Sequence, residues 1–393
     1  MHWFARKKSP DQPVTGLILP GGGARNAYQA GVLKAITEIL PENTANPFPV
    51  ICGTSAGALN AALLASNAHQ FRAGVQHLTG IWQHFHVDQV FRADPMTALK
   101  SGLRWTLAVM SGGLGRANPL SLLDNAPLRE LLETHVRLAR IQHAIDRGAL
   151  RALGITTSGY STGRSVTFYQ GVEGLRPWER NRRVGLSEEI SIDHLMASTA
   201  IPVVFPAVKL HNEYHGDGSM REHAPLSPAL HLGANRLLII GVRSRRSDPD
   251  LPGELPAAYP TLGQIAGYMF DTLFMDALDS DIERLNRINH TLTETRDQRV
   301  EFRDTALRPI EFLVISPSGD IGELVEHHAH TFPRAFRVLL HGLGALSRES
   351  RPLLSYLLFE AGFCRALMGM GYHDALRQRD DIFRLLGNST IAF

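Results

Sequence analysis

The sequence predicts an α/β protein built around a mostly parallel β-sheet, and two observations support this prediction. Residues 14–40 and 50–64 each run from a short apolar stretch through a glycine turn into apolar residues at helical spacing. Two later stretches, 236–242 and 310–315, are almost continuously apolar. Such runs are typical of strands buried on both faces of a parallel sheet. We therefore expect neighbouring parallel strands, with helices following the first two.

The composition limits the function classes to consider. The chain has 393 residues, enough for one large or two medium-sized domains. With 44% hydrophobic and 20% charged residues, it is typical of a soluble globular protein. The formal net charge of +2 and the lack of a basic stripe interleaved with aromatic residues argue against nucleic-acid binding. The basic clusters at 6–8 and 243–246 are interpreted as solvated loop charges in preference to contacts with anionic lipid headgroups.

The two cysteines and the apolar segments bear on location. Cys52 and Cys364 cannot form a disulfide framework or a cysteine metal site, which fits a reducing compartment. No secretory signal precedes the first predicted strand, and no uninterrupted apolar stretch is long enough to span a bilayer. Residues 353–372 come closest, but Glu360 and Arg365 interrupt them, so we interpret them as an amphipathic helix pair. We expect a cytoplasmic location, with peripheral contact at the inner membrane surface as an option.

The first predicted strand leads into a glycine loop. Residues 14–19 predict the strand, residues 21–23 are three consecutive glycines, and residues 26–40 have helical apolar spacing. Consecutive glycines at a helix start expose backbone N–H groups, which suits a phosphate or an oxyanion. A dinucleotide-binding loop is the weaker alternative, because Asn26 replaces its third glycine and no acidic residue ends a second strand. Arg25 either braces this loop or contacts an anionic headgroup.

The second unit carries a candidate nucleophile. Residues 50–53 predict a strand and residues 56–64 a helix, with Ser55 in the turn between them. The sequence Gly53-Thr-Ser-Ala-Gly57 matches the G-x-S-x-G nucleophile elbow, in which small neighbours allow a strained serine. A helix N-terminus also favours the negative charge of an attacking alkoxide and of the oxyanion that follows. A simple serine N-cap is the alternative.

The middle of the chain is predicted to be helical and then to return to strands. Residues 71–140 look mostly helical, and within them residues 90–120 form an apolar insert with a glycine-rich hinge at 111–115. This insert is interpreted either as a lid that binds acyl chains or as a plain packing helix and loop. Residues 150–157 and 165–169 predict two strands joined by a turn.

The second half of the chain contains a candidate base. Residues 192–198 predict a short helix, and Asp217 lies between two glycines after a short strand. An aspartate in this position is either part of a tight turn or a positioned base. Residues 249–260 form a proline-rich linker, residues 261–292 predict a long helical region, and the tail from 321 is amphipathic and helical.

Three motifs, at residues 21–25, 53–57 and 217–219, occur in an order and spacing that resemble the patatin-like phospholipases. In that family a glycine-rich oxyanion loop, a G-x-S-x-G serine and a D-G-[GA]-type aspartate follow one another along the chain. The match covers roughly residues 14–243, and the motifs are far more specific jointly than singly.

The resemblance implies a lipid acyl hydrolase with a Ser-Asp dyad that acts on acyl esters of phospholipids or lysophospholipids without calcium or another cofactor. Ser55 would be the nucleophile and Asp217 the general base that takes its proton directly. The oxyanion hole would be formed by the amides of Gly21, Gly22, Gly23 and Ala24.

The resemblance also implies a three-layer α/β/α sandwich with a central, mostly parallel sheet. We assign residues 14–320 to the catalytic domain, with the lid-like insert at about 90–120, and residues 321–393 to a helical extension. The chain departs from the family pattern at Asn26, where glycine is common, and at Ser219, where glycine or alanine is usual.

Two rival functions remain open at this point. A Ser-His-Asp triad is the nearest rival among hydrolases, but an α/β-hydrolase order using His223 leaves too few residues between acid and histidine. The histidines near Asp217 in sequence are His194, His211, His215 and His223. A non-catalytic lipid- or anion-binding module on the same scaffold is the alternative from another class. We expect peripheral membrane contact through residues 90–120 or the tail helices; the oligomeric state is left open.

Overall fold

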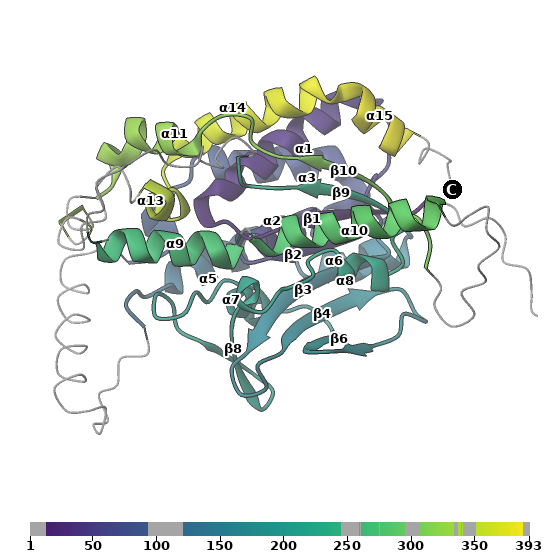
Figure 1. The fold of residues 1–393 in the computed structure, drawn as a ribbon, viewed down its shortest axis with the longest axis horizontal. Helices are drawn as coiled ribbons and strands as arrows, with labels where there is room; N and C mark the ends of the chain where they lie inside the picture. The colour runs from purple at the N-terminus through teal and green to yellow at the C-terminus, as the bar shows by residue number, and fades with distance from the viewer. Residues whose placement is uncertain are drawn as a thin grey trace, which may run out of the picture.

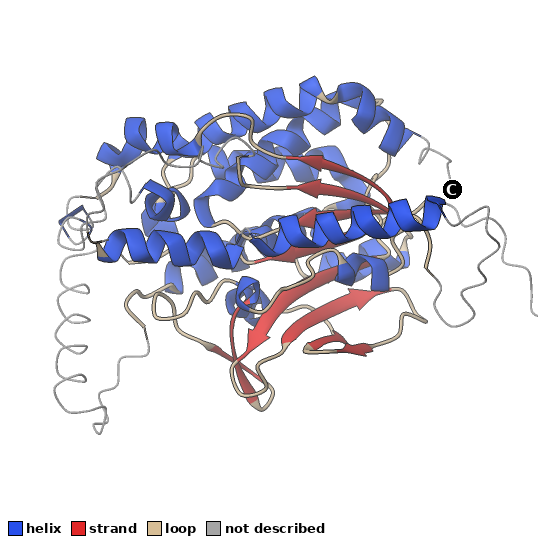
Figure 2. Ribbon diagram, viewed as in Figure 1, coloured by secondary structure: helices blue, strands red, loops and turns tan. Residues whose placement is uncertain are grey.

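The chain forms a three-layer α/β/α sandwich (Figures 1 and 2). The computed structural model describes residues 13–92, 121–244, 259, 261–274, 276–294, 307–333, 337, 338, 340 and 351–387. A single mixed sheet crosses the molecule, and helices pack on both of its faces. The predicted fold class is therefore confirmed.

The sheet is parallel from β10 to β3 and mixed toward the other edge, where β4 and β6 are parallel and the other pairs are antiparallel. Its strands are β1 (Thr15–Leu19), β2 (Val50–Thr54), β3 (Ala152–Gly159), β4 (Ser165–Gly171), β5 (Trp178–Arg180), β6 (Arg183–Ser187), β7 (Val208–Leu210), β8 (Glu213–Asp217), β9 (Arg236–Ile240) and β10 (Glu311–Ile315). They follow the order β10-β9-β1-β2-β3-β4-β6-β5, and every neighbouring pair from β10 to β3 is parallel. Strand β8 pairs antiparallel with the last part of β3, with Asp217 opposite Thr157. The carboxyl ends of β1, β2 and β8 therefore lie close together.

Helices cover the sheet, and the last part of the described chain, after β10, is helical. The α-helices are α1 (Ala27–Ile39), α2 (Ala56–Ser66), α3 (Phe71–Gln83), α5 (Ala126–His135), α6 (Ala139–Asp146), α7 (Ile192–Ser198), α8 (Ser227–His231), α9 (Leu262–Phe274), α10 (Asp276–Glu294), α11 (Ile321–His328), α13 (Arg351–Leu357), α14 (Ala361–Arg377) and α15 (Arg379–Gly387). Short 3-10 helices are η1 (Gly23–Asn26), η2 (Ala68–Gln70), η3 (Val87–Gln89), η4 (Gly218–Met220) and η6 (Ala329–Thr331).

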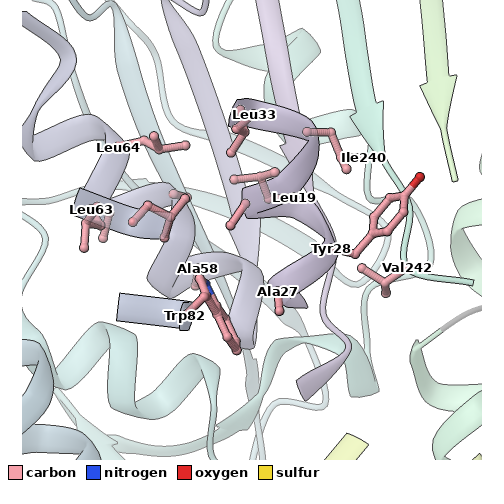
Figure 3. Close-up of a cluster of buried hydrophobic side chains, with 14 of the residues drawn as sticks. Leu19, Ala27, Tyr28, Leu33, Ala58, Leu63, Leu64, Trp82, Ile240 and Val242 are labelled. Carbon is pink, nitrogen blue, oxygen red and sulfur yellow. The ribbon is translucent and has the colours of Figure 1, made fainter. Parts of the chain in front are cut away.

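Two hydrophobic clusters form the core, one on each face of the sheet. In β1 the side chains alternate between them: Leu17 and Leu19 belong to the cluster that contains α1, α2 and α14, whereas Ile18 belongs to the cluster beneath α8 and α10. Figure 3 shows part of the first cluster, where Leu19 lies among side chains that include Tyr28 and Leu64. This alternation explains why the first strand is apolar from Leu17 to Leu19.

Helix α14 packs along α1 at very short range (Figure 1). A β-carbon on Gly31 would lie 2.0 Å from the carbonyl oxygen of Met368, and one on Gly371 would lie 2.3 Å from that of Tyr28. The hydroxyl of Tyr28 donates to Asp374 at 2.9 Å. The C-terminal helices therefore contribute directly to the layer that covers the first strand–turn–helix unit.

Several expected segments match the elements found, and others do not. The predicted helix at 192–198 is α7, and the helical region predicted for 261–292 contains α9 and α10. Strands β5, β6 and β7 were not predicted. From residue 93 onward, the expected lid at 90–120 lies outside the described residues. The predicted division into a catalytic domain at residues 14–320 and a helical extension at residues 321–393 stays a prediction.

The described ranges contain no single helix that is long and apolar enough to cross a bilayer. Helices α13 and α14 pass the same test of length and composition only as a pair, and they meet at 98°. They correspond to the helix pair that the interrupted apolar stretch at 353–372 predicts.

Candidate active site

Ser55 lies in a strained turn between β2 and α2. Its backbone angles are φ 54° and ψ −131°, a combination that residues with a side chain rarely adopt. A β-carbon on Gly53 would lie 2.4 Å from the carbonyl oxygen of Gly57, and one on Gly57 would lie 2.0 Å from that of Leu19. Glycine at these two positions lets α2 begin directly against the ends of β1 and β2. This is the strand–turn–helix setting that the G-x-S-x-G motif predicts.

The hydroxyl of Ser55 hydrogen-bonds directly with the carboxylate of Asp217. Ser55 Oγ donates to Asp217 Oδ2 at 2.6 Å, and the two residues are only 3% and 1% exposed. Ser55 makes no side-chain capping hydrogen bond to α2, so the N-cap alternative does not describe its side chain. A short, buried contact between a serine hydroxyl and a carboxylate is the geometry that a nucleophile and its base require.

Asp217 is itself held by its backbone neighbours. Its second carboxylate oxygen, Oδ1, accepts from the amide of Ser219 at 2.9 Å, and its own amide donates to the carbonyl of Ala200 at 2.8 Å. A β-carbon on Gly218 would lie 2.2 Å from the carbonyl oxygen of Thr156. Asp217 thus starts the tight turn η4 and faces Ser55 at the same time, so the two interpretations of this residue are compatible.

Ser198, which belongs to none of the sequence motifs, fixes the backbone of the elbow. The amide of Ser55 donates to Ser198 Oγ at 2.9 Å, and this hydroxyl donates in turn to the carbonyl of Thr156 at 2.6 Å. The last residue of α7 therefore joins the elbow to β3. The sequence predicted α7 but contained no signal that its final hydroxyl would meet a residue 143 positions away.

The glycine loop follows β1 and lies beside the elbow. Strands β1 and β2 are parallel neighbours with Leu19 opposite Gly53, so the segments that follow them leave the same edge of the sheet. Among the described backbone hydrogen bonds of turns, loops and caps, none is donated by the amides of Gly21 and Gly22, and Gly23 and Ala24 begin η1. Gly23 has φ +57°, and a β-carbon there would lie 2.2 Å from the carbonyl oxygen of Tyr356. The assignment of these amides to an oxyanion hole stays a prediction.

A buried network of polar side chains hydrogen-bonds to the start of this loop at Pro20. Asn26 and Gln29 both donate to the carbonyl of Pro20, at 2.8 and 3.0 Å. The side chain of Asn60 donates to Gln29 at 2.9 Å and accepts from the indole of Trp82 at 2.9 Å. Asn26 stands where the family that the motifs resemble commonly has glycine, and its side chain helps to hold the loop. The network links α1, α2 and α3 to the end of β1.

Arg25 joins the glycine loop to α9 and α13. Its side chain is buried; Nε donates to Ser355 Oγ at 2.7 Å, and Nη2 lies 3.4 Å from Asp271. The guanidinium stacks 4.0 Å above the ring of Tyr356, whose hydroxyl donates to Asp271 at 2.7 Å. Arg25 is thus tied to α9 and α13, and its role in bracing the glycine loop stays a prediction.

Two buried carboxyls lie near the elbow. Burial raises the pKa of Asp217 to about 6, against the opposing effect of hydrogen bonds from Ser55 and Ser219. Burial also raises the pKa of Glu222 to about 7; the nearby charge of Asp217 adds to this, and hydrogen bonds with Thr54 and Thr156 oppose it. Sequence reasoning missed Glu222, because a single glutamate in a polar loop is usually solvated.

Three of the histidines considered for a triad hydrogen-bond with other side chains. His194 hydrogen-bonds with Ser191, His211 with Glu188, and His215 with Thr157. Among the described hydrogen bonds, none joins His194, His211, His215 or His223 to Ser55 or Asp217. The described residues also contain no group of three or more His, Cys, Asp or Glu side chains arranged to hold a metal ion.

A family model described as patatin-like phospholipase matches residues 17–230, which is more than half of the chain. A cGAMP-activated phospholipase of Pseudomonas aeruginosa is 26% identical over 215 residues, 55% of this chain and 55% of that protein. Lysophospholipase nte1 of Aspergillus terreus is 49% identical over 53 residues, 14% of this chain and 3% of that protein. The chain therefore spans about half, or far less, of the length of the curated relatives it matches.

Two solved structures resemble the chain at low sequence identity. VipD from Legionella pneumophila is 11% identical, with a TM-score of 0.38, over 95% of this chain and 67% of that chain. Human GIVD cytosolic phospholipase A2, in complex with a fluorophosphonate inhibitor, is 12% identical, with a TM-score of 0.42, over 98% of this chain and 60% of that chain.

Proposed function

The chain belongs to the patatin-like phospholipase family, and on this premise we propose that it is a serine lipid acyl hydrolase. Its substrates are acyl esters of phospholipids or lysophospholipids, in line with the phospholipases among its relatives. The observation that carries the proposal is the 2.6 Å hydrogen bond from Ser55 Oγ to Asp217 Oδ2 at a strained, glycine-flanked elbow.

In the first half of the reaction, Ser55 Oγ attacks the ester carbonyl carbon while Asp217 accepts the hydroxyl proton. The carbonyl oxygen becomes an oxyanion, which the amides of residues 21–24 stabilise. The ester C–O bond then breaks, and protonated Asp217 returns the proton to the departing lysolipid alcohol. This leaves an acyl-enzyme on Ser55 and a carboxylate on Asp217.

In the second half, Asp217 takes a proton from water as the water oxygen attacks the acyl-enzyme. Collapse of the second tetrahedral intermediate releases the fatty acid and returns the proton to Ser55. A carboxylate is an effective base when burial raises its proton affinity. The raised pKa of Asp217, about 6, serves this role, and we expect the rate to increase with pH as Asp217 ionises.

The dyad is tested with Ser55→Ala and Asp217→Asn, measured on phospholipid vesicles and on a short p-nitrophenyl ester. Each variant should lose at least about 10³-fold in kcat, because nucleophile and base act as a unit. Ser161→Ala, which changes an exposed loop serine, is the control and should keep wild-type turnover. Circular dichroism and thermal unfolding establish that each variant is folded. Wild-type turnover by a folded Ser55 or Asp217 variant would rule out the dyad.

A fluorophosphonate reagent separates this proposal from a non-catalytic lipid-binding module. The wild-type chain should be modified covalently at Ser55, and the Ser55→Ala variant should not. A binding module without an activated serine would bind lipid but remain unmodified.

A further inference from the structure

Glu222 is a buried carboxyl that the proposed mechanism does not use. It follows η4, the short turn that begins directly after Asp217, and it is 9% exposed. Its carboxyl group hydrogen-bonds with the side chains of Thr54 and Thr156. A buried carboxyl is destabilising unless it has hydrogen-bond partners, and these two hydroxyls supply them. Glu222 is therefore fixed in place by β2 and β3, the strands on either side of it in the bond.

The two threonines occupy matching positions on neighbouring strands. Thr54 is the last residue of β2 and lies opposite Thr156 of β3 in the parallel register. Thr156 Oγ1 in turn lies 3.1 Å from Oγ1 of Thr167, its antiparallel partner on β4. All three threonines are buried. Glu222 thus joins two members of a row of hydroxyls that crosses three strands.

Both threonines are connected to the backbone that carries the dyad. Thr54 directly precedes Ser55, and the carbonyl of Thr156 accepts from the hydroxyl that holds the Ser55 amide. The turn after Asp217 packs on the same two residues: a β-carbon on Gly218 would lie 2.7 Å from Thr54 Cγ2 and 2.2 Å from the Thr156 carbonyl oxygen. A shift of Thr54 against Thr156 would therefore move Ser55 relative to Asp217.

Glu222 also faces the start of the glycine loop. It lines a small cavity together with Pro20, Gly21 and Ser219 and with the first residues of α10. The amide of Ser219 is the donor that holds Asp217 Oδ1. Glu222 therefore lies where the elbow, the turn after Asp217 and the glycine loop meet.

The charged groups around Glu222 favour its neutral form. Burial raises the pKa of Glu222 to about 7, and the negative charges of Asp217 and of Asp281 on α10 add to this, against the effect of the threonine hydrogen bonds. Arg284 lies 3.8 Å from Asp281 and is mostly exposed. The thiol of Cys52 on β2 is close enough for the charge of Glu222 to act on it, and burial raises the pKa of that thiol, so it is uncharged near pH 7. Two carboxyls that interact in this way titrate as a pair, with Asp217 the more acidic member.

We infer that Glu222 is a positioning residue for the dyad: its carboxyl group ties Thr54 to Thr156 and so holds the elbow in line with Asp217. This inference rests on the proposed function, because it concerns the rate of the same reaction. Glu222 acts through the two threonines and through its charge on Asp217. Displacement of a nucleophile by about 1 Å is enough to lower a rate by about 10²-fold.

The test compares Glu222→Gln, which keeps hydrogen-bonding groups, with Glu222→Leu, which removes them and leaves two buried hydroxyls without this partner. Turnover of the short p-nitrophenyl ester is measured from pH 5 to pH 9. Glu222→Leu should lower kcat at least about tenfold with little change in KM, because the nucleophile is misplaced. Glu222→Gln should recover most of this loss. Glu130→Gln, at an exposed position on α5, is the matched control and should keep wild-type kinetics.

The pH dependence distinguishes this role from a purely structural contact. The wild-type kcat should show two titrations between pH 5 and pH 9, one for each carboxyl of the pair, whereas the Glu222→Gln variant should keep only that of Asp217. Thermal unfolding follows the second titration without catalysis. Because the pKa of Glu222 is higher in the folded chain, the Tm of the wild type relative to Glu222→Gln should fall as the pH rises through about 7.

Two results would overturn the inference and leave the dyad in place. One is wild-type kcat in a folded Glu222→Leu variant, or a loss that Glu222→Gln does not recover. The other, which decides the matter if Glu222→Leu does not fold, is a Glu222→Gln profile of kcat against pH that matches the wild type. A wild-type chain that hydrolyses neither substrate would instead overturn the proposed function, and this inference with it.

Discussion

Ser55 and Asp217 are both held in states that an isolated chain would avoid. Ser55 has a positive φ, which is a strained conformation for a residue with a β-carbon, and Asp217 is a carboxyl almost wholly removed from water. Each is stabilised by contacts from distant strands and helices: Ser198 holds the Ser55 amide, and the Ala200 carbonyl holds the Asp217 amide. Strain and burial of this kind concentrate at catalytic centres.

Burial of Asp217 has a consequence for stability that depends on pH. Its pKa rises from 3.8 to about 6 on folding. A carboxyl whose pKa is higher in the folded chain contributes stability that is complete below about pH 4 and is lost as the pH rises through about 6. The change corresponds to about 3 kcal/mol. Asp217→Asn removes this titration, so the free energy of unfolding of the variant relative to the wild type should increase by about that amount between pH 4 and pH 7.

Denaturant unfolding at pH 4, 5, 6 and 7 measures this difference. Asp146→Asn, at an exposed position on α6, controls for the loss of a surface carboxyl. If the difference between the Asp217 variant and the wild type stays constant from pH 4 to pH 7, Asp217 does not titrate in this range.

At the residue scale, the sequence reveals those candidate site residues that lie in a local motif. Ser55 and Asp217 were singled out because glycines flank them at the ends of strands, which is a short-range signal. Their roles as nucleophile and base were taken from the resemblance of the three motifs to a known family, and they stay predictions. Ser198 and Glu222 were not identified, because their importance comes from contacts with segments far away in the sequence. A serine at the end of a helix and a glutamate in a loop have no local feature that distinguishes them from solvated residues.

At the scale of elements, the buried strands were predictable and the exposed ones were not. Strands β1, β2 and β9 are short, mostly apolar runs, whose pattern is set by burial on both faces of the sheet. Strand β10 is also a short apolar run, although it lies at an edge of the sheet and is only partly buried. Strands β5 and β6 contain arginine and glutamate, and they pair at the edge of the sheet where solvent contact is tolerated. Their pairing is decided by the neighbouring strand rather than by their own composition.

Arg25 connects three elements, and its removal should affect all of them. Arg25→Met leaves Asp271 without its cationic partner and removes the stacking on Tyr356. We expect a loss of about 2–3 kcal/mol in the free energy of unfolding and lower turnover of both the short ester and phospholipid. Arg129→Met removes an arginine from an exposed ion pair and should change stability by less than about 1 kcal/mol.

Thermal and denaturant unfolding together with the two activity assays distinguish the two roles considered for Arg25. A residue that contacts only the lipid headgroup would lower phospholipid turnover and leave both the stability and the short-ester rate unchanged. That outcome would contradict the bracing role.

At the scale of the whole molecule, the C-terminal helices complete the fold around the glycine loop. Helix α13 supplies Ser355 and Tyr356 to Arg25, and its backbone lies against Gly23. The sequence predicts amphipathic helices in this region, but amphipathic spacing does not say which surface they cover. The surface that α14 covers is set by glycines such as Gly31 and Gly371, where the two helix backbones come into close contact in the folded chain.

The packing of α14 on α1 can be tested at two glycines of the same helix. At Gly371 a β-carbon would lie 2.3 Å from the carbonyl oxygen of Tyr28, whereas at Gly369 nothing lies within 4 Å of that position. Gly371→Ala should force the two helices apart and lower the free energy of unfolding by about 1–3 kcal/mol. Gly369→Ala should leave it unchanged or raise it by about 0.5–1 kcal/mol, because alanine is the better helix former. If turnover of the short ester falls in the Gly371 variant and not in the Gly369 variant, the C-terminal layer supports the catalytic loop; equal stability of the two variants would show that α14 is not packed closely on α1.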